Sequence, residues 1–169
     1  MKIIEAMKKV KDLLRKAEDL RKLVGTHCCD LSFETPVYDD QIGEVSKWIQ
    51  AHSDILKEVI RLRVAIQRTN LYTDVIIELG GNHVTKKISE WIYRRRDMAK
   101  LELSAWTALT DKNLKEGQIQ TTGGETKDVK IRRHYSPAQR DKMIDQLRTE
   151  SSVIDGTLEV INAVTDLIE

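Results

Sequence analysis

The sequence predicts an all-α protein, an elongated antiparallel four-helix bundle built from coiled-coil-like helical hairpins. Three observations support this. Long segments repeat apolar residues every three or four positions, which is typical of amphipathic helices. The chain is 33% charged and only 5% aromatic, as expected for much solvated helix surface. A short polar motif occurs twice, each time at the end of such a segment. A length of 169 residues fits one domain.

We expect helices over residues 2–24, 41–76, 83–113 and 136–168. The first is expected to end at Gly25, and residues 25–40 have no helical period. The second is expected to stop at Gly80, and either Asn82 or Thr85 can cap the third. The last has the clearest start, because Ser136 can cap it and Pro137 suits the first helical position.

Residues 114–135 break the helical pattern. A Gly pair at 123–124 separates a polar stretch from an alternating one that includes Val129, Ile131 and Tyr135. Such alternation favours a small β-hairpin or a long loop before the last helix.

The helices indicate a duplication. Moving the apolar seam of the last helix back by 92 positions superposes it on the seam of the second, from Ile55 to Ile76. Two helical hairpins related by duplication explain this register. Helices of about 30 residues are roughly 45 Å long, and their apolar stripes are too wide for one chain to bury. A homo-oligomer is therefore expected.

The duplicated motif is Asn-x-x-Thr-Asp. One copy holds Asn70, Thr73 and Asp74, and the other holds Asn162, Thr165 and Asp166. These spacings place an amide, a hydroxyl and a carboxylate on one side of a helix end. Two interpretations stay open: the polar groups fix helix register by hydrogen bonding, or they line a pocket for a small ligand.

A second group of residues could bind anions. Arg95, Arg96 and Asp97 lie in the third helix, and Arg133 and Tyr135 come just before the cap at Ser136. Arginine pairs bidentately with phosphate or carboxylate, and a helix N-terminus favours anions. The alternative is a solvated charged face. Arg95 falls on an apolar stripe and needs a partner, for which Asp97, Asp74, Asp166 or a ligand phosphate could serve.

Composition excludes several classes of function. A formal net charge of +1 argues against nucleic-acid binding, and no apolar run could span a membrane. Adjacent Cys28 and Cys29 indicate reduced thiols, and hence a cytoplasmic protein, in bacteria or in a host cell if phage-encoded. Four scattered histidines offer no metal-ligand spacing. No nucleophile elbow, phosphate loop or dinucleotide fingerprint occurs, so no cofactor and no catalytic residue is predicted.

Several motifs together resemble a known family. They are IQRTN with a following Thr, a Gly-containing turn, RRD in a helix, a Tyr-Ser pair before the last helix, and a terminal Asn-x-x-Thr-Asp-Leu. The combination resembles the small all-helical bacterial and phage family known as septicolysins, whose activity is not established. The family carries an aromatic residue after the terminal Asn, where this chain has Ala163, which argues against stacking there.

The sequence thus predicts a non-enzymatic homo-oligomer that binds a small anionic ligand. A nucleotide-type signal, which the protein would sequester like a sponge, is one example of such a ligand. The alternative is a structural or adaptor protein whose helical faces mediate self-assembly or docking on a larger phage or bacterial assembly. The predicted ligand-binding residues are Arg68, Thr69, Asn70, Thr73, Arg95, Arg96, Asp97, Arg133, Tyr135, Ser136, Asn162 and Thr165.

Overall fold

The computed structural model describes residues 1–168 and divides into two compact units. Unit 1 holds residues 1–74, residues 87–89 and the described residues from 158 onward. Unit 2 holds residues 75–86 and 90–157.

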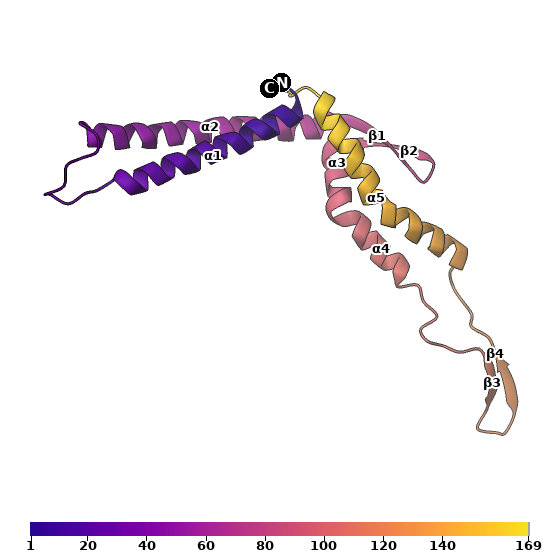
Figure 1. Cartoon of the computed structure of the whole chain (residues 1–169). Coiled ribbons are helices and arrows are strands. Elements are labelled where there is room, and N and C mark those ends of the chain that lie inside the picture. Colours follow the sequence, from indigo (N-terminus) through magenta and orange to yellow (C-terminus); the bar gives the residue numbers. More distant parts are fainter. Residues whose placement is uncertain (169) are drawn as a thin grey trace. The chain divides into compact units, whose positions relative to one another are not determined.

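A helical hairpin forms most of unit 1. Helix α1 (Ile3–His27) runs antiparallel beside α2 (Gln41–Tyr72), as Figure 1 shows. Ala6 and Val10 of α1 pack against Val59 and Leu62 of α2. These four are buried because the apolar period of each helix faces the other. The pair is also joined by an ion pair, with Lys9 Nζ 2.9 Å from a Glu58 carboxylate oxygen.

The α1–α2 loop carries its apolar side chains into solvent. Asp40 begins α2, accepting a hydrogen bond from the Gly43 N–H at 2.9 Å. Before it, Leu31, Phe33 and Val37 are all exposed, and Phe33 retains 82% of its accessible surface. These three residues do not contribute to the core of unit 1.

A β-hairpin follows α2 directly. Strand β1 (Asp74–Leu79) pairs with β2 (Asn82–Lys87). Between them, Gly80 and Gly81 have φ values of 58° and 82°, which favour glycine and suit a two-residue hairpin turn. Val75 and Ile77 alternate with exposed neighbours and are buried.

Three helical segments and a long helix complete the main part of unit 2. Helix α3 (Ile88–Tyr93) leads through a π-helical turn, η1 (Arg94–Met98), into α4 (Ala99–Thr107). Helix α5 (Pro137–Val164) lies beside them and continues into the residues of unit 1. Trp91 of α3 is fully buried and donates its indole N–H to the Val75 carbonyl at 3.0 Å.

A second β-hairpin precedes α5. Strands β3 (Gly117–Gln120) and β4 (Thr126–Val129) pair antiparallel, with Gly117 opposite Val129. Nearly all their side chains are exposed, so the hairpin is held by backbone hydrogen bonds rather than by an apolar face.

The prediction of a purely all-α bundle is wrong, because the chain is mixed, with two small antiparallel sheets. The first helix continues past Gly25 to His27, the second ends at Tyr72, not near 76, and the third begins at Ile88, not near 83. Thr73 and Ile76 fit a helical period, but Val75 and Ile77 are the buried pair, so the strand period prevails. Neither Asn82 nor Thr85 caps a helix, since both lie in β2.

Candidate functional site

The two copies of the Asn-x-x-Thr-Asp motif make the same contacts at two helix starts. The Thr73 carbonyl accepts from Ile88 N–H, the first residue of α3, at 3.1 Å. The Thr165 carbonyl accepts from Ile3 N–H, the first residue of α1, at 3.0 Å. Each motif therefore holds the first turn of another helix, which is the structural interpretation of these residues.

The aspartates of the two motif copies also make matching contacts. Asp74 pairs with Lys87 and Asp166 pairs with Lys2, each at 2.7 Å, and each lysine directly precedes the helix that the motif holds. Lys87 Nζ also donates to the Tyr72 carbonyl, and Lys2 Nζ donates to the Val164 carbonyl. Lys2 lowers the pKa of Asp166 below its ordinary value, by hydrogen bonding first and then by charge.

The remaining motif residues are divided between core and surface. Thr69 is fully buried; its hydroxyl donates to the Ala65 carbonyl and accepts from Ile168 N–H at 2.9 Å. Asn70 and Asn162 are half-buried, and the Asn70 side-chain oxygen has no hydrogen-bond partner among the described residues. Arg68 is exposed.

The arginines of η1 are paired with carboxylates within unit 2. Arg95 pairs with Asp155 of α5, and not with any of the partners that the sequence suggested. Its side chain is also 40% exposed, so the apolar stripe does not bury it. Arg96 lies 2.7 Å from its neighbour Asp97 on the surface. Each of these guanidinium groups thus already has one carboxylate partner.

Sequence reasoning missed the one buried charge of unit 2. Glu150 of α5 is 2% exposed and accepts from Arg94 Nη2 at 3.0 Å. Arg94 also lies 2.6 Å from Glu102, and Glu150 raises the pKa of Arg94 through the hydrogen bond. The sequence does contain a signal for the burial of Glu150. This residue follows Leu147 by three positions and precedes Ile154 by four, which places it on the apolar face of α5.

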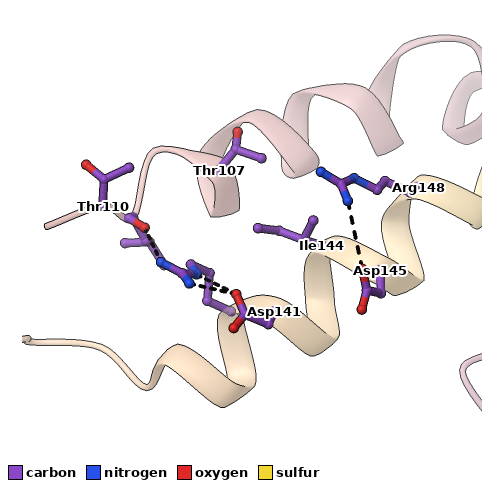
Figure 2. Close-up of a pocket in the computed structure, with 8 residues that line it drawn as sticks. Thr107, Thr110, Asp141, Ile144, Asp145 and Arg148 are labelled. Carbon is purple, nitrogen blue, oxygen red and sulfur yellow. Dashed lines mark hydrogen bonds and ion pairs between the residues drawn. The ribbon is translucent and has the colours of Figure 1, made fainter.

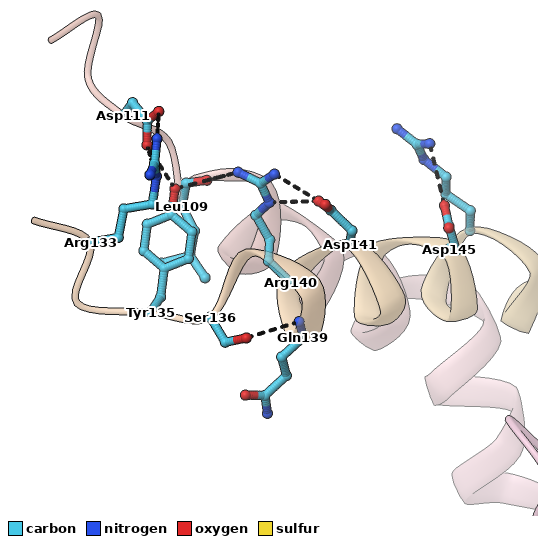
Figure 3. A network of polar contacts seen from close by, with 10 residues as sticks. Leu109, Asp111, Arg133, Tyr135, Ser136, Gln139, Arg140, Asp141 and Asp145 are labelled. Carbon is cyan, nitrogen blue, oxygen red and sulfur yellow. Dashed lines mark hydrogen bonds and ion pairs between the residues drawn. The ribbon is translucent and has the colours of Figure 1, made fainter. Parts of the chain in front are cut away.

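Arg133, Tyr135 and Ser136 do come together, around Asp111 and the start of α5 (Figure 3). Arg133 donates two hydrogen bonds to the Asp111 carboxylate, at 2.7 and 2.6 Å, and Tyr135 donates a longer one. Arg133 accordingly lowers the pKa of Asp111. Ser136 Oγ accepts from Gln139 N–H as the cap of α5.

A shallow groove of about 400 Å³ lies between the end of α4 and the first turns of α5. Ile144 and Arg148 project from α5 into it beside Thr107 (Figure 2). Arg140 lines the same groove, donates to the Leu109 carbonyl at 3.0 Å and pairs with Asp141. The groove therefore offers two arginines, each with an aspartate neighbour.

Helix α2 exposes a second apolar face, opposite the one that packs on α1. We call it the outer stripe. Its spacings of seven and four residues keep all members within about 40° of one line along the helix. The outer stripe consists of Ile42, Ile49, Leu56, Ile60, Val64 and Leu71. Ile42 is 83% exposed and Ile60 is 63% exposed, so unit 1 leaves this face uncovered.

Helix α5 lacks such a second face. At the positions 92 residues later, α5 and the turn before it carry no large apolar residue: His134, Asp141, Arg148, Ser152, Gly156 and Ala163. The inner seam is kept, with Leu147 and Ile154 buried where α2 has Ile55 and Leu62. Since α5 lacks the outer stripe and keeps the seam, the stripe is not required to build a helix of this type.

Residues 1–168 contain no group of three or more side chains suited to hold a metal ion. In the same part of the chain, no helix is long and apolar enough to cross a membrane. Cys28 and Cys29 are free and exposed.

Comparison of the chain with protein-family models, with curated proteins and with solved structures gave no match in any of the three.

Proposed function

We propose that this protein is a non-enzymatic structural or adaptor component that assembles with copies of itself through the outer stripe of α2. The observation that carries the proposal is a row of six exposed apolar side chains on a helix whose opposite face is already packed. Exposed apolar surface of this extent is unfavourable in water and marks interaction sites on soluble proteins.

The polar motifs support a structural role. The backbone carbonyls of Thr73 and Thr165 and the carboxylates of Asp74 and Asp166 hold the first turns of α1 and α3. A group engaged in this way contributes to the frame of the protein. The motif thereby fixes the hairpins that present the outer stripe.

Lysine substitution in the outer stripe tests the proposal. Ile60→Lys adds a charge to the exposed face and leaves the inner seam intact, so the helical circular dichroism should be unchanged. Sedimentation velocity should show an oligomer for the wild type and a smaller species for Ile60→Lys. Ser152→Lys is the matched control, because Ser152 is the exposed residue at the equivalent position of α5. An Ile60→Lys protein that sediments like the wild type would contradict the proposal.

Binding of a small anionic ligand, such as a nucleotide, is a second candidate. The groove between α4 and α5 favours it, because Arg140 and Arg148 line one concave surface next to the α5 N-terminus. Arg148 is the freer of the two, since its Asp145 partner is 3.9 Å away.

Thermal-shift measurements with nucleotides and sugar phosphates distinguish ligand binding in the groove from self-assembly alone. A ligand of the groove should raise the melting temperature of the wild type and not that of Arg148→Met. Arg132→Met is the control, since Arg132 is exposed and outside the groove. No stabilisation by any compound, or equal stabilisation of Arg148→Met, would eliminate the groove as the site.

A further inference from the structure

We propose that two copies of α2 pair antiparallel through their outer stripes, about a twofold axis between residues 56 and 57. The inference rests on the proposed self-assembly and specifies its partner, direction and register. Four features of unit 1 lead to it: the spacing of the stripe, the charges beside it, the apolar loop at the end of the hairpin, and the length of the stripe.

The spacing is palindromic for four of the six residues of the stripe, while Leu56 maps onto Lys57 and Ile60 maps onto Ser53. Reversing the helix about the midpoint of residues 56 and 57 exchanges Ile42 with Leu71 and Ile49 with Val64. Leu56 then lies beside the axis. A twofold interface requires such a self-complementary surface, because each residue of one copy meets the partner position of the other. Interdigitation of these side chains is the usual packing of antiparallel helices.

Charges on α2 favour the antiparallel direction. The charged residues of the half before residue 57 are Glu44, Lys47 and Asp54, and all three lie more than about 100° around the helix from the stripe. The half from residue 57 onward is basic, with one acid against four bases: Glu58 against Lys57, Arg61, Arg63 and Arg68. Antiparallel pairing keeps the basic halves of the two copies apart. Parallel pairing would instead bring the two basic halves together, which is repulsive.

The apolar loop extends the same interface. Phe33 and Val37 are exposed in the loop just before Ile42, at the start of the stripe. Leu71 and Tyr72 are exposed at the other end, where Tyr72 retains 68% of its accessible surface. In an antiparallel pair the start of one stripe meets the end of the other. Phe33 and Val37 of one copy can then cover Leu71 and Tyr72 of the second.

The area agrees with a pair of copies. From Ile42 to Leu71 the stripe is roughly 45 Å long at 1.5 Å per residue. A strip about 10 Å wide gives roughly 450 Å² of surface per copy, within the range of functional apolar patches. With the loops added at both ends, the contact approaches the roughly 800 Å² per partner of a stable interface.

Single cysteines test direction and register. Cys28→Ser and Cys29→Ser remove the two exposed native thiols. Ile49→Cys, Val64→Cys or Leu56→Cys is then added singly, and a short bismaleimide captures neighbouring thiols. Leu56→Cys should cross-link with itself, because its two copies lie close to the axis. Ile49→Cys and Val64→Cys should each remain uncross-linked alone, since 15 residues of helix separate the like thiols by about 22 Å.

Mixing two of the cysteine variants tests the antiparallel direction directly. A tagged Ile49→Cys protein, mixed with untagged Val64→Cys at low concentration and then concentrated, should give the mixed cross-linked product. Ser152→Cys on α5 is the control for random collision. Self-cross-linking of Ile49→Cys without the mixed product would show parallel pairing and overturn the inference. An oligomeric wild type with no cross-link at any of the three positions would also overturn it, while leaving self-assembly through another surface intact. A monomeric wild type would contradict the proposed function itself.

Discussion

Lys2 Nζ lies 2.7 Å from Asp166 Oδ2, and this contact joins residues from the two ends of the chain. Beside it, Leu167 N–H donates to the Met1 carbonyl at 2.9 Å. The arrangement matches that of Lys87 and Asp74, where the same pair lies at the ends of the β1–β2 hairpin. The Lys2–Asp166 pair thus lies at the start of α1 as the Lys87–Asp74 pair lies at the start of α3.

The repeated ion pairs should protect different helix starts. Asp166→Asn should speed amide hydrogen exchange of Ile3 by a few fold and leave Ile88 unchanged, because it loosens only the contact around Lys2. Asp74→Asn should give the opposite pattern. Hydrogen exchange followed by NMR checks both. Equal effects on Ile3 and Ile88 in either variant would show that the two contacts are not independent.

Removing the guanidinium that faces Glu150 should be strongly destabilising. Arg94→Met leaves a buried carboxylate without its main partner, which typically costs about 3–5 kcal/mol. Urea unfolding measures the loss. In the double variant Arg94→Met with Glu150→Leu, most of the stability should return, since no charge is left buried.

Arg96→Met is the matched control for this pair, because Arg96 lies in the same π-helical turn and pairs with Asp97 on the surface. Arg96→Met should change the free energy of unfolding only slightly. A loss of stability in Arg96→Met as large as in Arg94→Met would locate the effect in the turn itself.

The α1–α2 hairpin should lose stability in acid through Glu58. Arg61 and Lys9 lower the pKa of Glu58 from 4.5 to about 2. A carboxylate whose pKa is lowered by folding stabilises the fold fully above its ordinary pKa, and the contribution disappears as pH falls through the lowered value. Glu58→Gln should therefore be less stable than the wild type near neutral pH. The difference in urea midpoint should shrink steadily below about pH 4.5. A difference that stays constant down to about pH 3 would mean that the charge of Glu58 does not contribute.

In the turn between β1 and β2, alanine should be more destabilising at Gly80 than at Gly81. Both Gly80 and Gly81 have positive φ, so Ala at either position is strained by roughly 1 kcal/mol. A Cβ at Gly80 would also lie 2.6 Å from Gln146 Oε1, whereas one at Gly81 meets open space. Gly80→Ala should therefore lower the melting temperature more than Gly81→Ala. Adding Gln146→Ala to each variant should reduce the difference between their melting temperatures. Equal melting temperatures for the two single variants would exclude a role for the Gln146 contact.

The sequence was informative about the long helices, because their apolar period is unbroken over many turns. Ile55, Val59 and Leu62 mark the packed face of α2, and Ser136 marks the start of α5. The β1–β2 hairpin was missed because Thr73 and Ile76 extend the helical period into a segment with a competing strand period. The Gly80–Gly81 pair suits either a helix stop or a hairpin turn, and the structure shows the turn.

The partners of the arginines could not be predicted in the same way. Asp155 and Glu150 lie more than 50 positions after Arg95 and Arg94, and only the packing of η1 on α5 brings them together. The outer stripe, in contrast, is visible in the sequence as a second apolar line on the helix. Its importance emerged only when the structure showed that the inner seam alone packs on α1.

The molecular mass in solution tests the central claim most directly. Sedimentation equilibrium over a range of micromolar concentrations should show a dimer, twice the 19.4 kDa of the chain, that dissociates on dilution. Ile60→Lys should remain at the mass of one chain under the same conditions. A wild-type protein that stays at 19.4 kDa at the highest concentration would contradict assembly through α2.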